Sequence, residues 1–165
     1  MRNKKTLLVG LTALLVGGVA TADAPTDLLF KFDSSALPAN AQVELTRVAS
    51  RARSHDELIV LDGSADQTGD TNYNVGLSIR RSEAVRSQLI SLGVDPGKII
   101  IAAFGEDSLR RNSFADDRRV TIWTTRESVA SVIALTFAGH GTAVRWNKPL
   151  SVAQIDASSA PIAAR

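Results

Sequence analysis

Arg81 is the residue whose type and position point most directly to chemistry. It falls four residues after Leu77 and four before Val85, on the apolar stripe of a helix predicted over residues 73–92. A charged guanidinium on such a face needs a partner or a ligand. Asp66 lies in the loop just before this helix, so loop and helix can bring the two side chains together. The pair is therefore either a structural ion pair or part of a binding site.

A neighbouring carboxylate and guanidinium form a receptor for a zwitterion. The carboxylate accepts an ammonium group, and the guanidinium donates two hydrogen bonds to a carboxylate. Asp33 follows the first predicted strand as Asp66 follows the second, and ligands of α/β sheets favour loops at the carboxyl ends of strands. Asn74, near the start of the helix, can add amide hydrogen bonds. The sequence thus predicts a polar binding site at this edge of the sheet.

Catalytic and metal-binding patterns are missing from the sequence. It contains no cysteine, which excludes disulfides, thiolate metal sites, a cysteine nucleophile and a lipid-modified N-terminal cysteine. The only histidines, His55 and His140, are too far apart in sequence to suggest a metal cluster, and no serine lies in a G-x-S-x-G turn. We therefore expect a binding module that is not an enzyme and that uses no metal and no cofactor.

The elements that position these residues alternate between strands and helices. Apolar runs predict strands at 28–32, 57–62, 98–104 and 119–125, and helical spacing predicts helices at 38–53 and 73–92. This order predicts an α/β (α+β) two-layer sandwich, with two main helices packed on a mixed sheet of about four strands. Crossovers through the helices favour parallel pairing in part of that sheet.

The two ends of the chain differ from this central segment. Arg2, Lys4 and Lys5 precede a short apolar run and small residues, which predicts a cleaved signal peptide over residues 1–22. Without it, 16 basic residues face 17 acidic ones, a balance that gives no electrostatic reason to bind nucleic acid. Over residues 127–165 we expect an extension in which Val132–Phe137 and Thr142–Trp146 form a β-hairpin, followed by a frayed tail.

Residues 28–125 resemble the OmpA-like peptidoglycan-binding domain, a family that includes peptidoglycan-associated lipoproteins and flagellar stator proteins. The family pattern G-[HY]-[TA]-D-x-x-G, followed by N-x-x-L-S-x-x-R-A, corresponds here to GSADQTG at 63–69 and NVGLSIRRS at 74–82. Phe32-Asp33 and Arg118-Arg119-Val120 match the family on either side. Ser64 replaces the usual histidine or tyrosine, and Ala65 stands where threonine is common, so we expect affinity to differ more than the identity of the ligand. We place the domain at residues 26–126.

The resemblance implies non-covalent binding of peptidoglycan through the diaminopimelate residue of its stem peptide. Asp66 would hold the free ammonium and Arg81 the free carboxylate, with further hydrogen bonds from Asp33, Ser34 and Asn74. Arg80 and the Arg118-Arg119 pair are interpreted as solvated or structural charges that could also meet acidic ligand groups.

The resemblance also implies a location and an alternative role. It places the protein in the periplasm of a Gram-negative-type bacterium, attached to the cell wall or the outer membrane, with the extension available to an envelope protein partner. The alternative is a wall anchor within a larger envelope machine, such as a stator or secretion complex, that retains residues 1–22 as a membrane anchor. A wall-active enzyme would need a metal triad or paired carboxylates, and the sequence offers neither.

Overall fold

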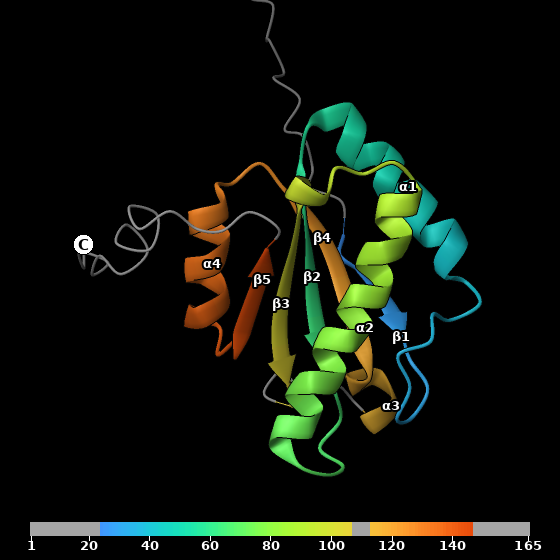
Figure 1. Cartoon of the computed structure of the whole chain (residues 1–165), viewed down its shortest axis with the longest axis vertical. Coiled ribbons are helices and arrows are strands. Elements are labelled where there is room, and N and C mark those ends of the chain that lie inside the picture. The colour runs from blue at the N-terminus through green and yellow to red at the C-terminus, as the bar shows by residue number, and fades with distance from the viewer. Residues whose placement is uncertain (1–23, 107–112, 147–165) are drawn as a thin grey trace, which may run out of the picture.

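The computed structural model describes residues 24–106 and 113–146 (Figure 1). The expected signal peptide and the expected frayed tail beyond Trp146 lie outside the described residues. The elements are, in chain order, β1 (Thr26–Leu29), α1 (Ala41–His55), β2 (Leu58–Ser64), α2 (Thr71–Ser91), the 3-10 turn η1 (Pro96–Lys98), β3 (Ile99–Gly105), α3 (Phe114–Asp117), β4 (Arg119–Thr125), α4 (Val129–Ala138) and β5 (Ala143–Trp146).

A five-stranded mixed sheet with the order β1-β4-β2-β3-β5 forms the centre of the molecule. β2 and β3 are parallel, because α2 crosses over between them, and the other neighbouring strands are antiparallel. The parallel pair brings the carboxyl ends of β2 and β3 to the same edge, where α2 begins. The predicted mixed sheet under two main helices is confirmed.

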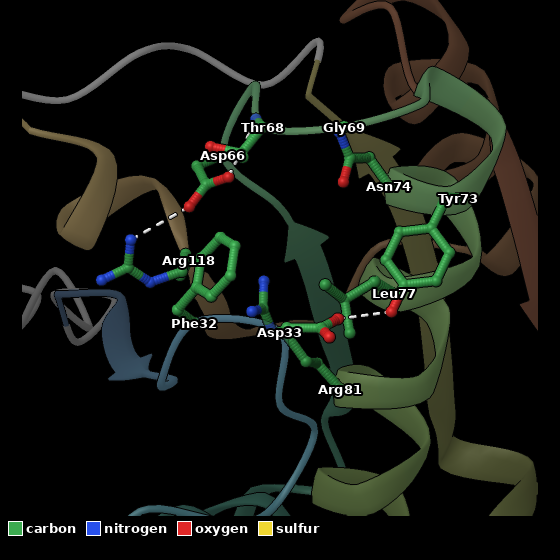
Figure 2. Close-up of a pocket in the computed structure, with 10 residues that line it drawn as sticks. All are labelled: Phe32, Asp33, Asp66, Thr68, Gly69, Tyr73, Asn74, Leu77, Arg81 and Arg118. Carbon is green, nitrogen blue, oxygen red and sulfur yellow. Dashed lines mark hydrogen bonds and ion pairs between the residues drawn. The ribbon is translucent and has the colours of Figure 1, made fainter.

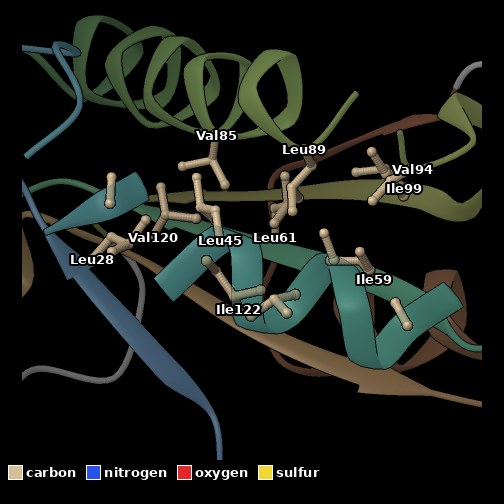
Figure 3. Close-up of a cluster of buried hydrophobic side chains, with 14 of the residues drawn as sticks. Leu28, Leu45, Ile59, Leu61, Val85, Leu89, Val94, Ile99, Val120 and Ile122 are labelled. Carbon is tan, nitrogen blue, oxygen red and sulfur yellow. The ribbon is translucent and has the colours of Figure 1, made fainter. Parts of the chain in front are cut away.

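α1 and α2 cover one face of the sheet and enclose the main hydrophobic core (Figures 1 and 3). α1 contributes Leu45 and Ala49, and α2 contributes Val85 and Leu89, at the helical spacing that places them on one side. The strands supply alternate residues, such as Ile59 and Leu61 of β2, because successive side chains point to opposite faces. This packing fixes α2 over the sheet.

Gly63 allows α2 to lie close to β2 beside the predicted site. A Cβ atom at position 63 would lie 2.5 Å from both the Ser78 carbonyl oxygen and the Ser82 Oγ, so no larger residue fits without movement. Asp70 then caps α2, because its side chain accepts hydrogen bonds from the backbone N–H groups of Asn72 and Tyr73. The first turns of α2 are thereby held at the edge of the sheet where β2 ends.

The C-terminal extension corrects one prediction. Residues 132–137, expected to form the first arm of a hairpin, lie in α4. The side chain of Ser128 accepts a hydrogen bond from the Ser131 N–H at 3.1 Å and caps this helix. α4 buries Val132, Ile133 and Thr136, which share one helical face. The strand prediction for this segment was wrong because nearly all of its residues are apolar, so the sequence fits the two-residue period of a strand as well as the 3.6-residue period of a helix.

The second arm is a strand, as predicted, but it has a different partner. β5 pairs antiparallel with β3, with Val144 opposite Ala102. α4 and β5 thus bury a second, smaller cluster on the face of the sheet away from α1 and α2, built on Val60, Ile100, Ala102 and Val132. The extension therefore completes the sheet instead of forming a separate hairpin.

Candidate functional site

A pocket of about 200 Å³ lies at the edge of the sheet where β2 ends (Figure 2). Its walls come from the loop after β1, the loop after β2, the first half of α2 and the residue before β4. The lining residues are Phe32, Asp33, Asp66, Thr68, Gly69, Tyr73, Asn74, Leu77, Arg81 and Arg118. Four of the five predicted site residues therefore lie together. The fifth, Ser34, does not line the pocket.

Arg81 is held by backbone oxygen atoms. Its side chain is completely buried, and its Nε, Nη1 and Nη2 atoms donate hydrogen bonds to three carbonyl oxygens. These acceptors are Ser34 at 2.9 Å, Ser64 at 2.9 Å and Lys31 at 3.2 Å. The guanidinium also lies 5.5 Å from the centroid of the Phe30 ring. Arg81 thus ties the loop after β1 to the end of β2, and two of its five N–H groups remain for a ligand.

Burial lowers the pKa of Arg81 to about 10, although the negative charge of Asp66 opposes this shift. Nearby Arg118 contributes further to the lowering through repulsion between like charges. At neutral pH the group still carries its positive charge. The pocket therefore contains a fixed positive charge. Within the described part of the chain, no carboxylate side chain is in direct contact with it, so it is available to an incoming anion.

Asp66 supplies the negative charge of the pocket. Its Oδ1 accepts a hydrogen bond from the Thr68 N–H at 3.0 Å, and its Oδ2 accepts one from Arg118 Nη1 at 3.0 Å. Burial alone would raise the pKa of the Asp66 carboxyl, but the hydrogen bonds from Arg118 and Thr68 outweigh it and hold the pKa below its usual range. Asp66 and Arg81 share the pocket, but the ion-pair partner of Asp66 among the described residues is Arg118.

Arg118 is the site residue that the sequence analysis underrated. Its Nε donates to the Phe30 carbonyl oxygen at 3.3 Å, and its side chain lines the pocket. The signal available in the sequence was the Arg118-Arg119 pair at the start of a strand. Because side chains alternate along a strand, only one of two neighbouring residues can face the pocket. Arg119 instead contacts Asp117 at 3.4 Å, which agrees with a structural charge.

Asp33 and Tyr73 form the opposite rim of the pocket. The Tyr73 hydroxyl donates a hydrogen bond to Asp33 Oδ1, as the dashed line in Figure 2 shows. Asp33 has a positive φ of 49°, a backbone conformation that aspartate tolerates better than most residues. Tyr73 is about half exposed, at 47%. This rim therefore offers a ligand both a carboxylate and an aromatic surface.

Asn74 is fixed by a residue from the end of β3. Its Nδ2 donates to Glu106 Oε2 at 2.7 Å, and the hydroxyl of Thr71 donates to Glu106 Oε1 at 3.0 Å. The amide of Asn74 is almost completely buried, at 1% exposure, and its Oδ1 is the atom left for a ligand N–H. Glu106 therefore orients Asn74 without lining the pocket.

The pocket contains two carboxylates, Asp33 and Asp66, and two guanidinium groups, Arg81 and Arg118. This balance suits a ligand group that carries both signs of charge. Within residues 24–106 and 113–146, no group of three or more acidic, histidine or cysteine side chains could hold a metal ion. No helix in the same ranges is long and apolar enough to span a membrane.

Comparison with known proteins defines the class of this domain. The OmpA family matches residues 29–121, more than half of the chain, and the protein belongs to that family. The peptidoglycan-associated lipoprotein of Pseudomonas putida is 32% identical over 108 residues, covering 62% of this chain and 65% of the relative. Outer membrane protein A of Bordetella avium is 36% identical over 94 residues, covering 56% and 48%. The matched segment thus spans between about half and two thirds of these relatives.

Solved structures share the fold. The crystal structure of the peptidoglycan-associated lipoprotein from Burkholderia pseudomallei matches with a TM-score of 0.54 at 30% identity, covering 60% of this chain and 89% of that one. The C-terminal domain of Helicobacter pylori MotB matches with a TM-score of 0.55 at 18% identity, covering 68% and 92%. The predicted resemblance to the OmpA-like family is therefore confirmed. Strand β5 and helix α4 lie beyond the residues that the family matches.

Proposed function

We propose that this protein binds peptidoglycan non-covalently, by holding the diaminopimelate residue of the stem peptide in the pocket beside α2. The observation that carries the proposal is that Asp66 and Arg81 line the same pocket. Each is held by a different partner, Asp66 by Arg118 and Arg81 by backbone carbonyl oxygens such as that of Ser64. The free end of diaminopimelate carries an ammonium and a carboxylate on the same carbon atom. One small pocket with both signs of charge can take both groups at once.

Each residue has a defined part in this proposal. The ligand ammonium would donate to Asp66, whose lowered pKa keeps it ionised, and to Asp33 across the pocket. The ligand carboxylate would accept from the unused N–H groups of Arg81, and Arg118 would add a second cation beside it. Asn74 Oδ1 would accept a hydrogen bond from a backbone amide of the peptide. Ser34 would contribute through its carbonyl oxygen, which fixes the guanidinium of Arg81.

Membership of the OmpA family supports the same proposed function. Relatives in it are named peptidoglycan-associated lipoproteins, so association with the cell wall is the property carried over to this chain. A wall-bound protein of this kind would act in the periplasm after export, and the signal peptide predicted over residues 1–22 provides the route. We propose that it works as a binding module and not as an enzyme. Intact-mass measurement of the exported protein would test the predicted cleavage after Ala22.

Cosedimentation with purified cell-wall sacculi tests the binding. Sacculi with diaminopimelate should retain the protein, whereas sacculi with lysine at the same position lack the side-chain carboxylate and should retain much less. Asp66→Asn keeps the shape of the side chain and removes its charge, so it should lose most of the retention. Losing a charge-assisted contact of this kind costs roughly 2–4 kcal/mol.

Asp56→Asn is the matched control. It makes the same change of charge at a residue that is 88% exposed, in the turn before β2 and thus at the opposite end of that strand from the pocket. It should keep full retention. Equal retention of wild type and folded Asp66→Asn, or equal retention on both kinds of sacculi, would refute the proposed site.

A further inference from the structure

A second hollow lies against α2, next to the pocket. It has a volume of about 490 Å³ and is lined by Ser35, Gly76, Ile79, Arg80, Glu83 and Arg145. The hollow adjoins the pocket at Tyr73 and Arg80. Tyr73 lines the pocket, Arg80 lines the hollow, and the Arg80 guanidinium lies 5.2 Å from the centroid of the Tyr73 ring. A ligand that extends out of the pocket past Tyr73 therefore meets Arg80 next.

Arg80 is the available cation of this hollow. It is exposed, and in the part of the chain that the structure describes no ion pair joins it to an acid. Its contact with the face of Tyr73 holds the guanidinium in place without neutralising it. Gly76 leaves room beside it, because a Cβ atom at position 76 would lie 3.2 Å from Arg80 Nη1.

Glu83, the one carboxylate among the described residues that line the hollow, is already paired. It contacts Arg86 at 3.4 Å and Arg145 of β5 at 3.8 Å. Its negative charge is thus offset by two cations, and Arg80 remains to attract an anion. The hollow therefore favours a carboxylate over an ammonium or a neutral group.

We infer that Arg80 forms a second anion subsite, which takes the α-carboxylate of the γ-linked D-glutamate that precedes diaminopimelate in the stem peptide. This inference rests on the proposed function. The γ-linkage leaves that α-carboxylate free, and the glutamate side chain, the amide and the diaminopimelate side chain separate it from the group in the pocket. This path contains about as many bonds as three residues of extended chain, which spans roughly 10 Å at about 3.3–3.6 Å per residue. The carboxylate can therefore pass the Tyr73 ring, whose centroid lies 5.2 Å from the Arg80 guanidinium, to reach Arg80.

Titration calorimetry with two synthetic tripeptides tests this subsite. One is L-alanyl-γ-D-glutamyl-diaminopimelate, and the other carries D-isoglutamine, in which the α-carboxylate is a carboxamide. Wild type should bind the acidic peptide about three- to fivefold more tightly, the size expected for a partly exposed ion pair. Arg80→Gln should bind both peptides equally, and Arg80→Lys should keep part of the preference.

Arg126→Gln is the matched control, because it removes the same charge from a residue 59% exposed, just after β4 and far along that strand from Arg118. It should keep the full preference. If Arg80→Gln still prefers the acidic peptide, the subsite is wrong while the proposed function stands. If Arg80→Gln weakens binding of both peptides by the same factor, Arg80 instead contacts the C-terminal carboxylate, which both peptides carry, and the inference is overturned. If wild type binds neither tripeptide, the proposed function fails, and the inference fails with it.

Discussion

Replacing Arg81 with alanine should destabilise the fold as well as remove the proposed ligand contact. The completely buried guanidinium donates to the carbonyl oxygens of Lys31, Ser34 and Ser64. The hydrogen bond to Ser64 is buried, so leaving that oxygen without a donor costs about 1–3 kcal/mol. The other two carbonyls lie nearer the surface and can recruit water, at about 0.5–1 kcal/mol each. The free energy of unfolding should therefore fall by about 2–5 kcal/mol.

Urea unfolding followed by circular dichroism measures this loss. For a domain of this size the expected shift is roughly 1–3 M in the midpoint. Arg81→Lys keeps the charge but has no planar fork, so it should recover less than half of the loss. Arg80→Ala, one residue away and exposed, should shift the free energy of unfolding by no more than about 0.5 kcal/mol. A midpoint for Arg81→Ala equal to that of wild type would refute the structural role of the three carbonyl contacts.

Three further predictions follow from the packing and the charges. Burial raises the pKa of Asp62 to about 6, although the hydrogen bond from Trp123 opposes this, so the folded state holds a proton that the unfolded state releases. The free energy of unfolding should therefore fall by up to about 3 kcal/mol as the pH rises from about 4 to 6, and urea titrations should show that Asp62→Asn removes this dependence. Gly63→Ala should lower the melting temperature measurably, because its Cβ would clash with the Ser78 carbonyl; an unchanged melting temperature would mean that α2 shifts freely. Val132→Ala should cost about 1–2 kcal/mol in urea unfolding by opening a space under α4, while retention on sacculi stays at the wild-type level, since no pocket residue lies in α4.

Much of the fold could be predicted because its periodic patterns are unambiguous. The run RVTIWTT predicted β4 with the bounds that the structure has, and the apolar stripe of α2 predicted that Arg81 is buried. The segment VASVIALTFA could not be assigned in the same way. Its own residues are apolar around nearly the whole helix, and the choice between helix and strand depended on the Ser128 cap and on packing against β3.

The candidate site was predictable in its membership but not in its contacts. Loop position and helix position were enough to bring Asp33, Asp66, Asn74 and Arg81 to one pocket. The partner of Asp66 was not predictable, because Arg118 is 52 residues away in sequence and meets it only through the antiparallel pairing of β4 with β2. Short-range spacing carries no information about such a contact.

The way Arg81 is anchored has a consequence for how this site can vary among related sequences. All three of its acceptors are main-chain oxygens, and every amino acid supplies an identical oxygen at positions 31, 34 and 64. Ser64, which stands where the family pattern has histidine or tyrosine, meets the requirement with its carbonyl alone. Mutational drift at these three positions can therefore change the outline and polarity around the pocket while the guanidinium keeps its place. Holding Arg81 requires only that the backbone keeps its course at these positions. Their side chains are therefore free to change under selection for other properties.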